Sequence, residues 1–144
     1  NLLIRRCNFV LLAMIIIILC LCSLAVSQTW TFQRLTGVPS GSWKSVAMSD
    51  DGTIMYVVAP SSVYRSTNSG VTWSRINANL NSYYAVACDS TCTVVTIGAN
   101  SNGIWSNIGG SFTQTYSNSN SYTIYQIVMD STGTYVAAMC SGLG

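Results

Sequence analysis

The feature that most constrains this chain is an internal repeat of about 40 residues. The repeat units cover about 42–81, 82–121 and 122–144, and the third unit is incomplete. Repeats of this size need neighbouring copies to bury their apolar faces, so the period predicts a repeat architecture. Two sets of positions align the three copies: Met48, Cys88 and Met129, and Gly52, Cys92 and Gly133.

Each complete copy reads as four short strands separated by turns rich in Asp, Asn, Ser and Gly. The run at 53–59 contains few polar residues, which predicts a strand that is covered on both faces. Copy three supplies the first two strands only. The ranges expected for the strands of copies one and two are 43–48, 53–59, 63–66, 71–76, 84–88, 92–97, 103–106 and 112–116.

Four hairpin-connected strands in each copy are typical of a propeller blade. We therefore expect an all-β fold over residues 28–144: a partial β-propeller of four-stranded antiparallel blades, with about two and a half blades. Residues 29–35 resemble the last strand of a further blade, because Trp30 corresponds to Trp73. Since a propeller needs four to eight blades, we expect this sequence to be part of a longer reading frame.

The first 27 residues have the pattern of a secretory leader. Arg5 and Arg6 precede an apolar stretch at 9–26, and small residues occupy Ala25 and Ser27. Residues 1–27 are therefore expected to be a signal peptide, which places the protein outside the cell. The alternative is an uncleaved anchor, because the apolar stretch nearly reaches the length that spans a bilayer. In that case the protein would contact the membrane only through this segment.

Charged residues are few, and they balance after the leader. Two of the six basic residues are Arg5 and Arg6 in the leader, and the other four equal in number the four aspartates of the rest of the chain. A neutral, charge-poor surface argues against a nucleic-acid partner, whose binding depends on neutralising phosphates. The four aspartates all fall in the first hairpin turn of a copy, where turn formation is their expected role: Asp50, Asp51, Asp89 and Asp130.

Three of the six cysteines lie in the leader. Cys88 and Cys92 flank a tight turn, at which facing residues come within disulfide reach, so we expect a bridge between them. A metal site is the alternative, but zinc needs four ligands and the chain has no His. Cys140 is left over, either buried in a strand or paired with a residue elsewhere.

One short motif connects the chain to a known family. Residues 66–73, STNSGVTW, resemble the Asp-box, or bacterial neuraminidase repeat, with Asn at the Asp position. The corresponding segment at 106–112 keeps the Ser, the Gly and an aromatic residue but loses the Asp. Sialidases, sortilin-type receptors and photosystem II assembly factors carry this motif. The residues that carry the resemblance are Ser66, Asn68, Gly70, Thr72, Trp73, Ser106, Gly110 and Phe112.

The resemblance implies a structural role for the motif, in the hairpin between the third and fourth strands of a blade and away from the catalytic face. The residue types agree with that role. Ser66 and Asn68 can bond the backbone of their own turn. Gly70 tolerates a conformation that a residue with a Cβ avoids, and Trp73 offers an apolar face for packing.

Catalytic residues are missing from this sequence. The chain contains neither Glu nor His, whereas a sialidase would need a Tyr–Glu pair, an acidic Asp and clustered arginines. No nucleophilic triad and no phosphate-binding glycine loop occurs. We therefore expect no catalytic residue, cofactor or metal in this chain, and an enzyme only if catalytic blades lie outside it.

The expected function is non-enzymatic binding of glycans or of another extracellular protein on the propeller. Aromatic side chains at a blade rim can stack on sugar rings, although packing between blades is their commoner role. Two alternatives remain: part of a secreted sialidase-like glycoside hydrolase, and an assembly-factor-like scaffold. The aromatic residues near the openings of the first strands of copies two and three are Tyr83, Tyr84, Tyr122 and Tyr125.

Overall fold

The computed structural model divides the chain into two units, Asn1–Arg34 and Leu35–Gly144, and the fold described here belongs to the second. The leader at 1–27 and most of the strand expected at 29–35 lie outside the described residues. Within the described part, no helix is long and apolar enough to cross a membrane. The structure describes residues 34–35, 37–76, 82–100, 103–108, 111–117 and 122–141.

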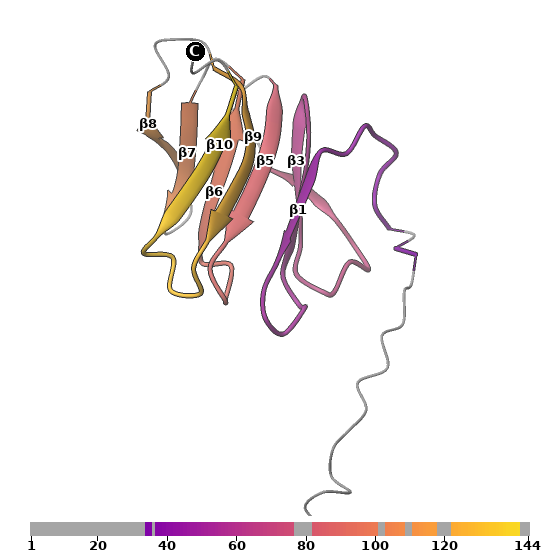
Figure 1. Cartoon of the computed structure of the whole chain (residues 1–144). Helices are drawn as coiled ribbons and strands as arrows, with labels where there is room; N and C mark the ends of the chain where they lie inside the picture. Colours follow the sequence, from indigo (N-terminus) through magenta and orange to yellow (C-terminus); the bar gives the residue numbers. More distant parts are fainter. Residues whose placement is uncertain are drawn as a thin grey trace, which may run out of the picture. The chain divides into compact units, whose positions relative to one another are not determined.

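All regular structure in these ranges is β-strand, which confirms the all-β prediction. The strands form three open antiparallel sheets, in which each strand pairs with the next one in sequence (Figure 1). The first sheet consists of β1 (Ser45–Met48), β2 (Met55–Ala59), β3 (Ser62–Ser66) and β4 (Ser74–Ile76). The second sheet consists of β5 (Tyr83–Cys88), β6 (Val94–Ala99), β7 (Gly103–Ile108) and β8 (Phe112–Tyr116). The third sheet consists of β9 (Ile124–Met129) and β10 (Val136–Cys140).

Each sheet is built from one copy of the repeat, and the predicted strands agree with the observed ones to within a few residues. The strand expected at 71–76 begins only at Ser74, because the three preceding residues belong to the turn between β3 and β4. The strand expected at 92–97 is shifted to 94–99, because Cys92 and Thr93 belong to the turn before it. At both places the side chains of polar turn residues form hydrogen bonds with the backbone, which in a strand would pair with a neighbouring strand.

The sheets contact one another mainly through the first strand of each copy. β5 lies against β1 and β2, and β9 lies against β5 and β6. The Val86 N–H in β5 donates to the hydroxyl of Ser45 in β1 at 3.2 Å. The larger hydrophobic core lies between the first two sheets, and its buried residues are Tyr56, Val58, Val63, Tyr83, Val86, Cys92, Val95 and Ile97.

Hydrogen bonds of one kind also join the first turns of successive sheets. The Asp50 N–H donates to the Ser90 carbonyl oxygen at 2.8 Å, and the Ser90 N–H donates to the Ser131 carbonyl oxygen at 3.0 Å. The same backbone contact therefore relates sheet one to sheet two and sheet two to sheet three. The three sheets repeat in space as the copies repeat in sequence.

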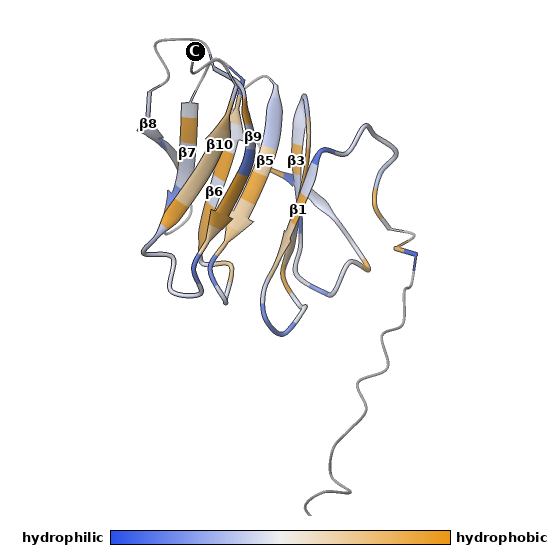
Figure 2. Ribbon diagram, viewed as in Figure 1, coloured by the Kyte–Doolittle hydropathy of each residue, from blue (hydrophilic) through white to orange (hydrophobic). Residues whose placement is uncertain are grey.

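The second strand of the third sheet is much less buried than the second strands of the other two sheets. β2 is buried from Tyr56 to Ala59 and β6 is buried from Val95 to Ala99, as expected for strands covered on both faces. In β10 the residues from Val136 to Met139 are all exposed. β10 pairs only with β9, so one of its edges has no strand partner among the described residues. Figure 2 shows apolar residues along β9 and β10 as well as along β5 and β6.

Candidate functional site

The turn at 66–73, between β3 and β4, is held together by the hydroxyl of Ser66, which is only 1% exposed. Its oxygen accepts the Gly70 N–H at 2.9 Å and the Asn68 N–H at 3.3 Å, and the hydroxyl donates to Asn68 Oδ1 at 3.0 Å. Gly70 is buried with φ of +82°. A Cβ at Gly70 would also lie 2.9 Å from a methyl group of Leu35. The turn therefore needs both this serine and this glycine.

The Asn68 side chain bonds Thr72 within the same turn. Its Oδ1 accepts the Thr72 N–H at 2.9 Å, and its Nδ2 donates to Thr72 Oγ1 at 2.8 Å. The indole N–H of Trp73 donates to the Gly70 carbonyl at 3.0 Å, and the ring is half-buried. Asn68 and Thr72 are exposed, but both are engaged in the turn. This arrangement accounts for the motif as a structural element.

The corresponding segment of copy two uses its serine differently. Ser106 lies in β7 and is 7% exposed. Its hydroxyl shares hydrogen bonds with those of Thr96, at 3.0 Å, and Thr115, at 3.3 Å, on the two neighbouring strands. Phe112 begins β8 and packs against the core. Gly110 lies outside the described residues. Ser106 thus bonds across the sheet, whereas Ser66 holds a turn.

The first hairpin turns of the three copies share one hydrogen-bond pattern. In each turn a side-chain oxygen accepts the N–H of the residue five positions later. The donors and acceptors are Ile54 and Ser49 Oγ at 3.0 Å, Val94 and Asp89 Oδ1 at 2.8 Å, and Tyr135 and Asp130 Oδ1 at 2.7 Å. In copies two and three an Asp is followed two residues later by a Thr that donates to it. In copy one the order of hydroxyl and carboxylate is reversed, because Ser49 comes first and donates to Asp51 two residues later, at 2.6 Å.

These bonds change the acidity of the three aspartates. The Ser49 hydroxyl and the Thr53 N–H and hydroxyl lower the pKa of Asp51. Thr132 and the Tyr135 N–H lower the pKa of Asp130 in the same way. Burial opposes ionisation of Asp89, but the bonds from Val94, Thr91 and Thr93 outweigh it and lower the pKa. All three carboxylates serve the turns, as the sequence predicted.

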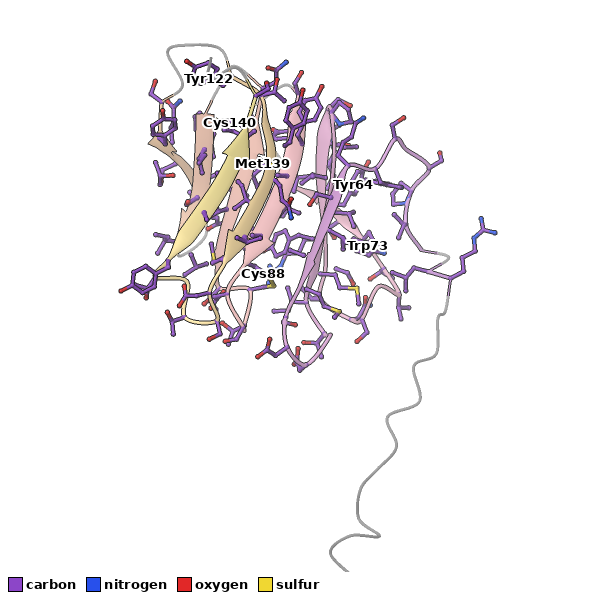
Figure 3. All side chains as sticks on the ribbon, viewed as in Figure 1. Tyr64, Trp73, Cys88, Tyr122, Met139 and Cys140 are labelled. Carbon is purple, nitrogen blue, oxygen red and sulfur yellow. A yellow bond between two sulfur atoms is a disulfide. The ribbon has the colours of Figure 1, made fainter. Side chains whose placement is uncertain are left out.

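The sulfur atoms of Cys88 and Cys92 lie 2.11 Å apart and form a disulfide, which is consistent with the predicted bridge. Cys140, at the end of β10, is half-buried and free. Among the described residues, no group of three or more His, Cys, Asp or Glu side chains comes together. Figure 3 shows Cys88 near the turns and Cys140 at the end of β10.

The four predicted binding aromatics do not form one platform. Tyr83 is 1% exposed and belongs to the core, which agrees with the packing role and leaves its ring no open face for a ligand. Tyr84 and Tyr125 meet edge to face across β5 and β9, with ring centroids 6.0 Å apart. Lys44 Nζ lies 5.7 Å from the centroid of the Tyr84 ring. Tyr122 is half-buried. Packing between sheets accounts for Tyr84, and Tyr125 alone is largely exposed.

A cavity of about 440 Å³ at the other end of the first sheet, away from the turn at 66–73, combines aromatic and polar groups. The rings of Trp43 and Tyr64 line it, edge to face, with centroids 5.7 Å apart. Arg75 Nη2 donates to the Ser61 carbonyl at 3.0 Å, which fixes the guanidinium at the rim. Hydroxyls and backbone complete the lining, from Ser40, Ser42, Ser61 and Ser62. This lining offers ring faces beside fixed hydrogen-bond donors.

Reasoning from the sequence missed this cavity. Tyr64 and Arg75 are cross-strand partners in β3 and β4, so the hairpin register could have placed them side by side. Trp43 precedes β1 and reaches Tyr64 past β2, a contact that only the folded sheet creates. Copy two carries Tyr83, Ile104 and Gln114 at the corresponding positions, so the repeat gave no signal for this set.

No protein-family model matches this chain. A search of curated proteins also finds no match. The site is therefore interpreted from its own residues.

Proposed function

We propose that this protein is an extracellular, non-enzymatic Asp-box β-propeller that binds glycans in the cavity between Trp43, Tyr64 and Arg75. The cavity is the observation that carries the proposal. Its volume of about 440 Å³ falls within the range of small-ligand sites. Aromatic rings bind the apolar faces of sugars, and a guanidinium with several hydroxyls bonds their edges.

The propeller part of the proposal is supported by how the sheets succeed one another. Each complete copy is a four-stranded meander, and the first strands of successive copies lie against each other. The repeated bonds from Asp50 to Ser90 and from Ser90 to Ser131 relate successive sheets in the same way. A closed ring uses four or more blades, so the proposal expects further copies of the repeat in the full-length protein.

The extracellular part is supported by two independent features. The pattern at 1–27 is typical of a secretory leader, and disulfides such as Cys88–Cys92 persist in oxidising compartments. Residues 1–27 lie outside the described part of the structure, so the leader is proposed on its sequence alone.

The test is binding of the full chain to immobilised mono- and disaccharides, both neutral and N-acetylated, followed by titration of each sugar that binds. We expect Tyr64→Ala and Arg75→Ala to weaken binding at least tenfold, because each removes a different part of the cavity. Binding that survives both substitutions would place the sugar elsewhere and overturn the proposed site. Failure to bind any sugar would overturn the glycan proposal itself.

Two substitutions outside the cavity serve as matched controls. Tyr116 in β8 is 55% exposed and does not line the cavity, so Tyr116→Ala removes an aromatic ring without touching it. Arg34→Ala removes an exposed basic residue in the same way. Both controls are expected to bind as the unaltered chain does. Far-ultraviolet circular dichroism of each variant checks that the sheets are retained.

A further inference from the structure

We infer a second ligand site, for an oxyanion, in a separate cavity of about 330 Å³ beside Arg65. Arg65 lies in β3 directly opposite Tyr56 of β2, and both side chains lie on the side of the first sheet that faces the second. Asn107 of β7 lines the cavity from the second sheet. The site goes beyond the proposed glycan cavity, with which it shares no lining residue.

The central observation is that one buried donor of the Arg65 guanidinium has no hydrogen-bond acceptor. Its Nε is buried and has no hydrogen-bond partner. The guanidinium lies over the Tyr56 ring, with its carbon 5.8 Å from the ring centroid. No ion pair joins described residues, and the carboxylates of Asp51, Asp89 and Asp130 are engaged in their own turns. A buried donor on a cation is costly to leave unpaired, which favours an anionic partner.

The remaining polar groups that line the cavity near Arg65 can all donate hydrogen bonds. Thr72 Oγ1 already accepts a bond from Asn68 Nδ2, so its hydroxyl hydrogen is free to donate. Thr67 and Ser74 add exposed hydroxyls to the same cavity. A guanidinium fork with hydroxyls around it matches the acceptor oxygens of a carboxylate, sulfate or phosphate. No carboxylate lines the cavity to repel such a group.

The site belongs to copy one alone. The residue that corresponds to Arg65 in copy two is Trp105, which has no charge. The Arg65 position therefore varies between copies whose turns and core positions agree. An arginine that served only to pack against Tyr56 could be replaced by another large side chain, as the second copy shows.

The test follows the Arg65 Nε–H resonance in ¹H–¹⁵N spectra of the full chain during titration with sodium sulfate, phosphate or acetate. Sodium chloride at matched ionic strength is the reference. We expect one Nε–H signal, absent in Arg65→Lys, to shift saturably with at least one oxyanion and not with chloride. A response to acetate assigns a carboxylate ligand, whereas a response to sulfate or phosphate alone assigns a tetrahedral oxyanion. No saturable response, or one that chloride reproduces, overturns the inference.

Substitutions at Thr72 separate binding from packing. Thr72→Val removes the donating hydroxyl and is expected to weaken the oxyanion about fivefold, whereas Thr72→Ser keeps the hydroxyl and should bind normally. The Arg34 Nε–H signal should stay unshifted throughout as an internal control. Equal affinities for the Val and Ser variants would show that the hydroxyl contributes nothing, which contradicts the site as described. The spectra of the unaltered chain test the site even if a variant fails to fold.

Discussion

Cys92 adopts the left-handed backbone conformation that Gly52 adopts at the same place in the preceding copy, with φ of 53° and 71°. Gly133 takes it again in the third copy, with φ of 73°. Left-handed backbone costs a residue with a Cβ about 1–2 kcal/mol, a cost that glycine avoids. In the second turn a cysteine occupies the position that the other copies give to glycine, and there it forms a disulfide with Cys88.

This relationship predicts the result of replacing the cysteines. With Cys88→Ser as the common background, adding Cys92→Gly should give a variant about 1 kcal/mol more stable than adding Cys92→Ala, because only the alanine keeps the strained backbone. Urea unfolding followed by circular dichroism measures the difference. Equal stabilities would show that the turn relaxes to another conformation once the bridge is absent.

The bridge itself predicts a defined mass change. A preparation that lacks residues 1–27, and with them Cys7, Cys20 and Cys22, should gain two protons when it is reduced after purification without reductant. Alkylation should then add two further labels, at Cys88 and Cys92. Cys140 should be labelled before reduction, because its thiol is free and the residue is partly exposed. Tandem mass spectrometry locates the labels. An unchanged mass on reduction would exclude the bridge.

Ser66 and Ser106 occupy corresponding positions of copies one and two, but replacing them should cause unequal losses of stability. Ser66→Ala leaves the buried Gly70 N–H without its acceptor and should cost about 1–3 kcal/mol. Ser106→Ala also takes a partner from the buried Thr96 hydroxyl, but a hydroxyl can rotate toward another acceptor whereas the Gly70 N–H cannot, so the cost should be only about 1 kcal/mol. Chemical unfolding of both variants provides the comparison. A larger loss for Ser106→Ala would mean that the turn contributes less than its bonding indicates.

Asn68→Asp should be tolerated, because a carboxylate accepts the same Thr72 N–H and the Thr72 hydroxyl can rotate to donate. We expect a change in stability within about 0.5 kcal/mol. Asn68→Leu, of similar size, cannot accept these bonds and should cost about 1–2 kcal/mol. Thermal melting of the two variants beside the unaltered chain tests both expectations, and a destabilised Asp variant would contradict the first.

The turn aspartates predict acid sensitivity. Their pKa values are lowered in the folded chain, so the folded state binds fewer protons than the unfolded state near the ordinary aspartate pKa. Their stabilisation is therefore complete above about pH 4 and is lost as the pH falls through the folded values. Melting temperatures between pH 7 and pH 2 should show this decline. Asp89→Asn should flatten it, and an unchanged pH profile in that variant would contradict the assignment.

Much of the fold follows from local sequence. The alternation in β1, the apolar run of β2 and the Asp–Ser–Thr–Gly turns act over a few residues, so the period predicted one meander per copy. The disulfide pair could be placed for the same reason, because Cys88 and Cys92 flank a single turn. The sequence left the roles of the tyrosines open between packing and binding, because exposure depends on the neighbouring sheet. In β5 its ring enters the core, while Tyr84 next to it lies beside Lys44 and Tyr125.

By itself, the sequence determined the repeat, the strand order and the turns, since hydrogen bonds and backbone preferences between near neighbours decide them. The tertiary structure decided which side chains share a cavity. Trp43 meets Tyr64 past an intervening strand, and Arg65 and Asn107 line one cavity from two different sheets. Both relationships depend on how sheets twist and pack, which involves residues far apart in the chain. Copies that agree in their turns and core positions differ at these positions, so the period that predicts the fold carries no information about them.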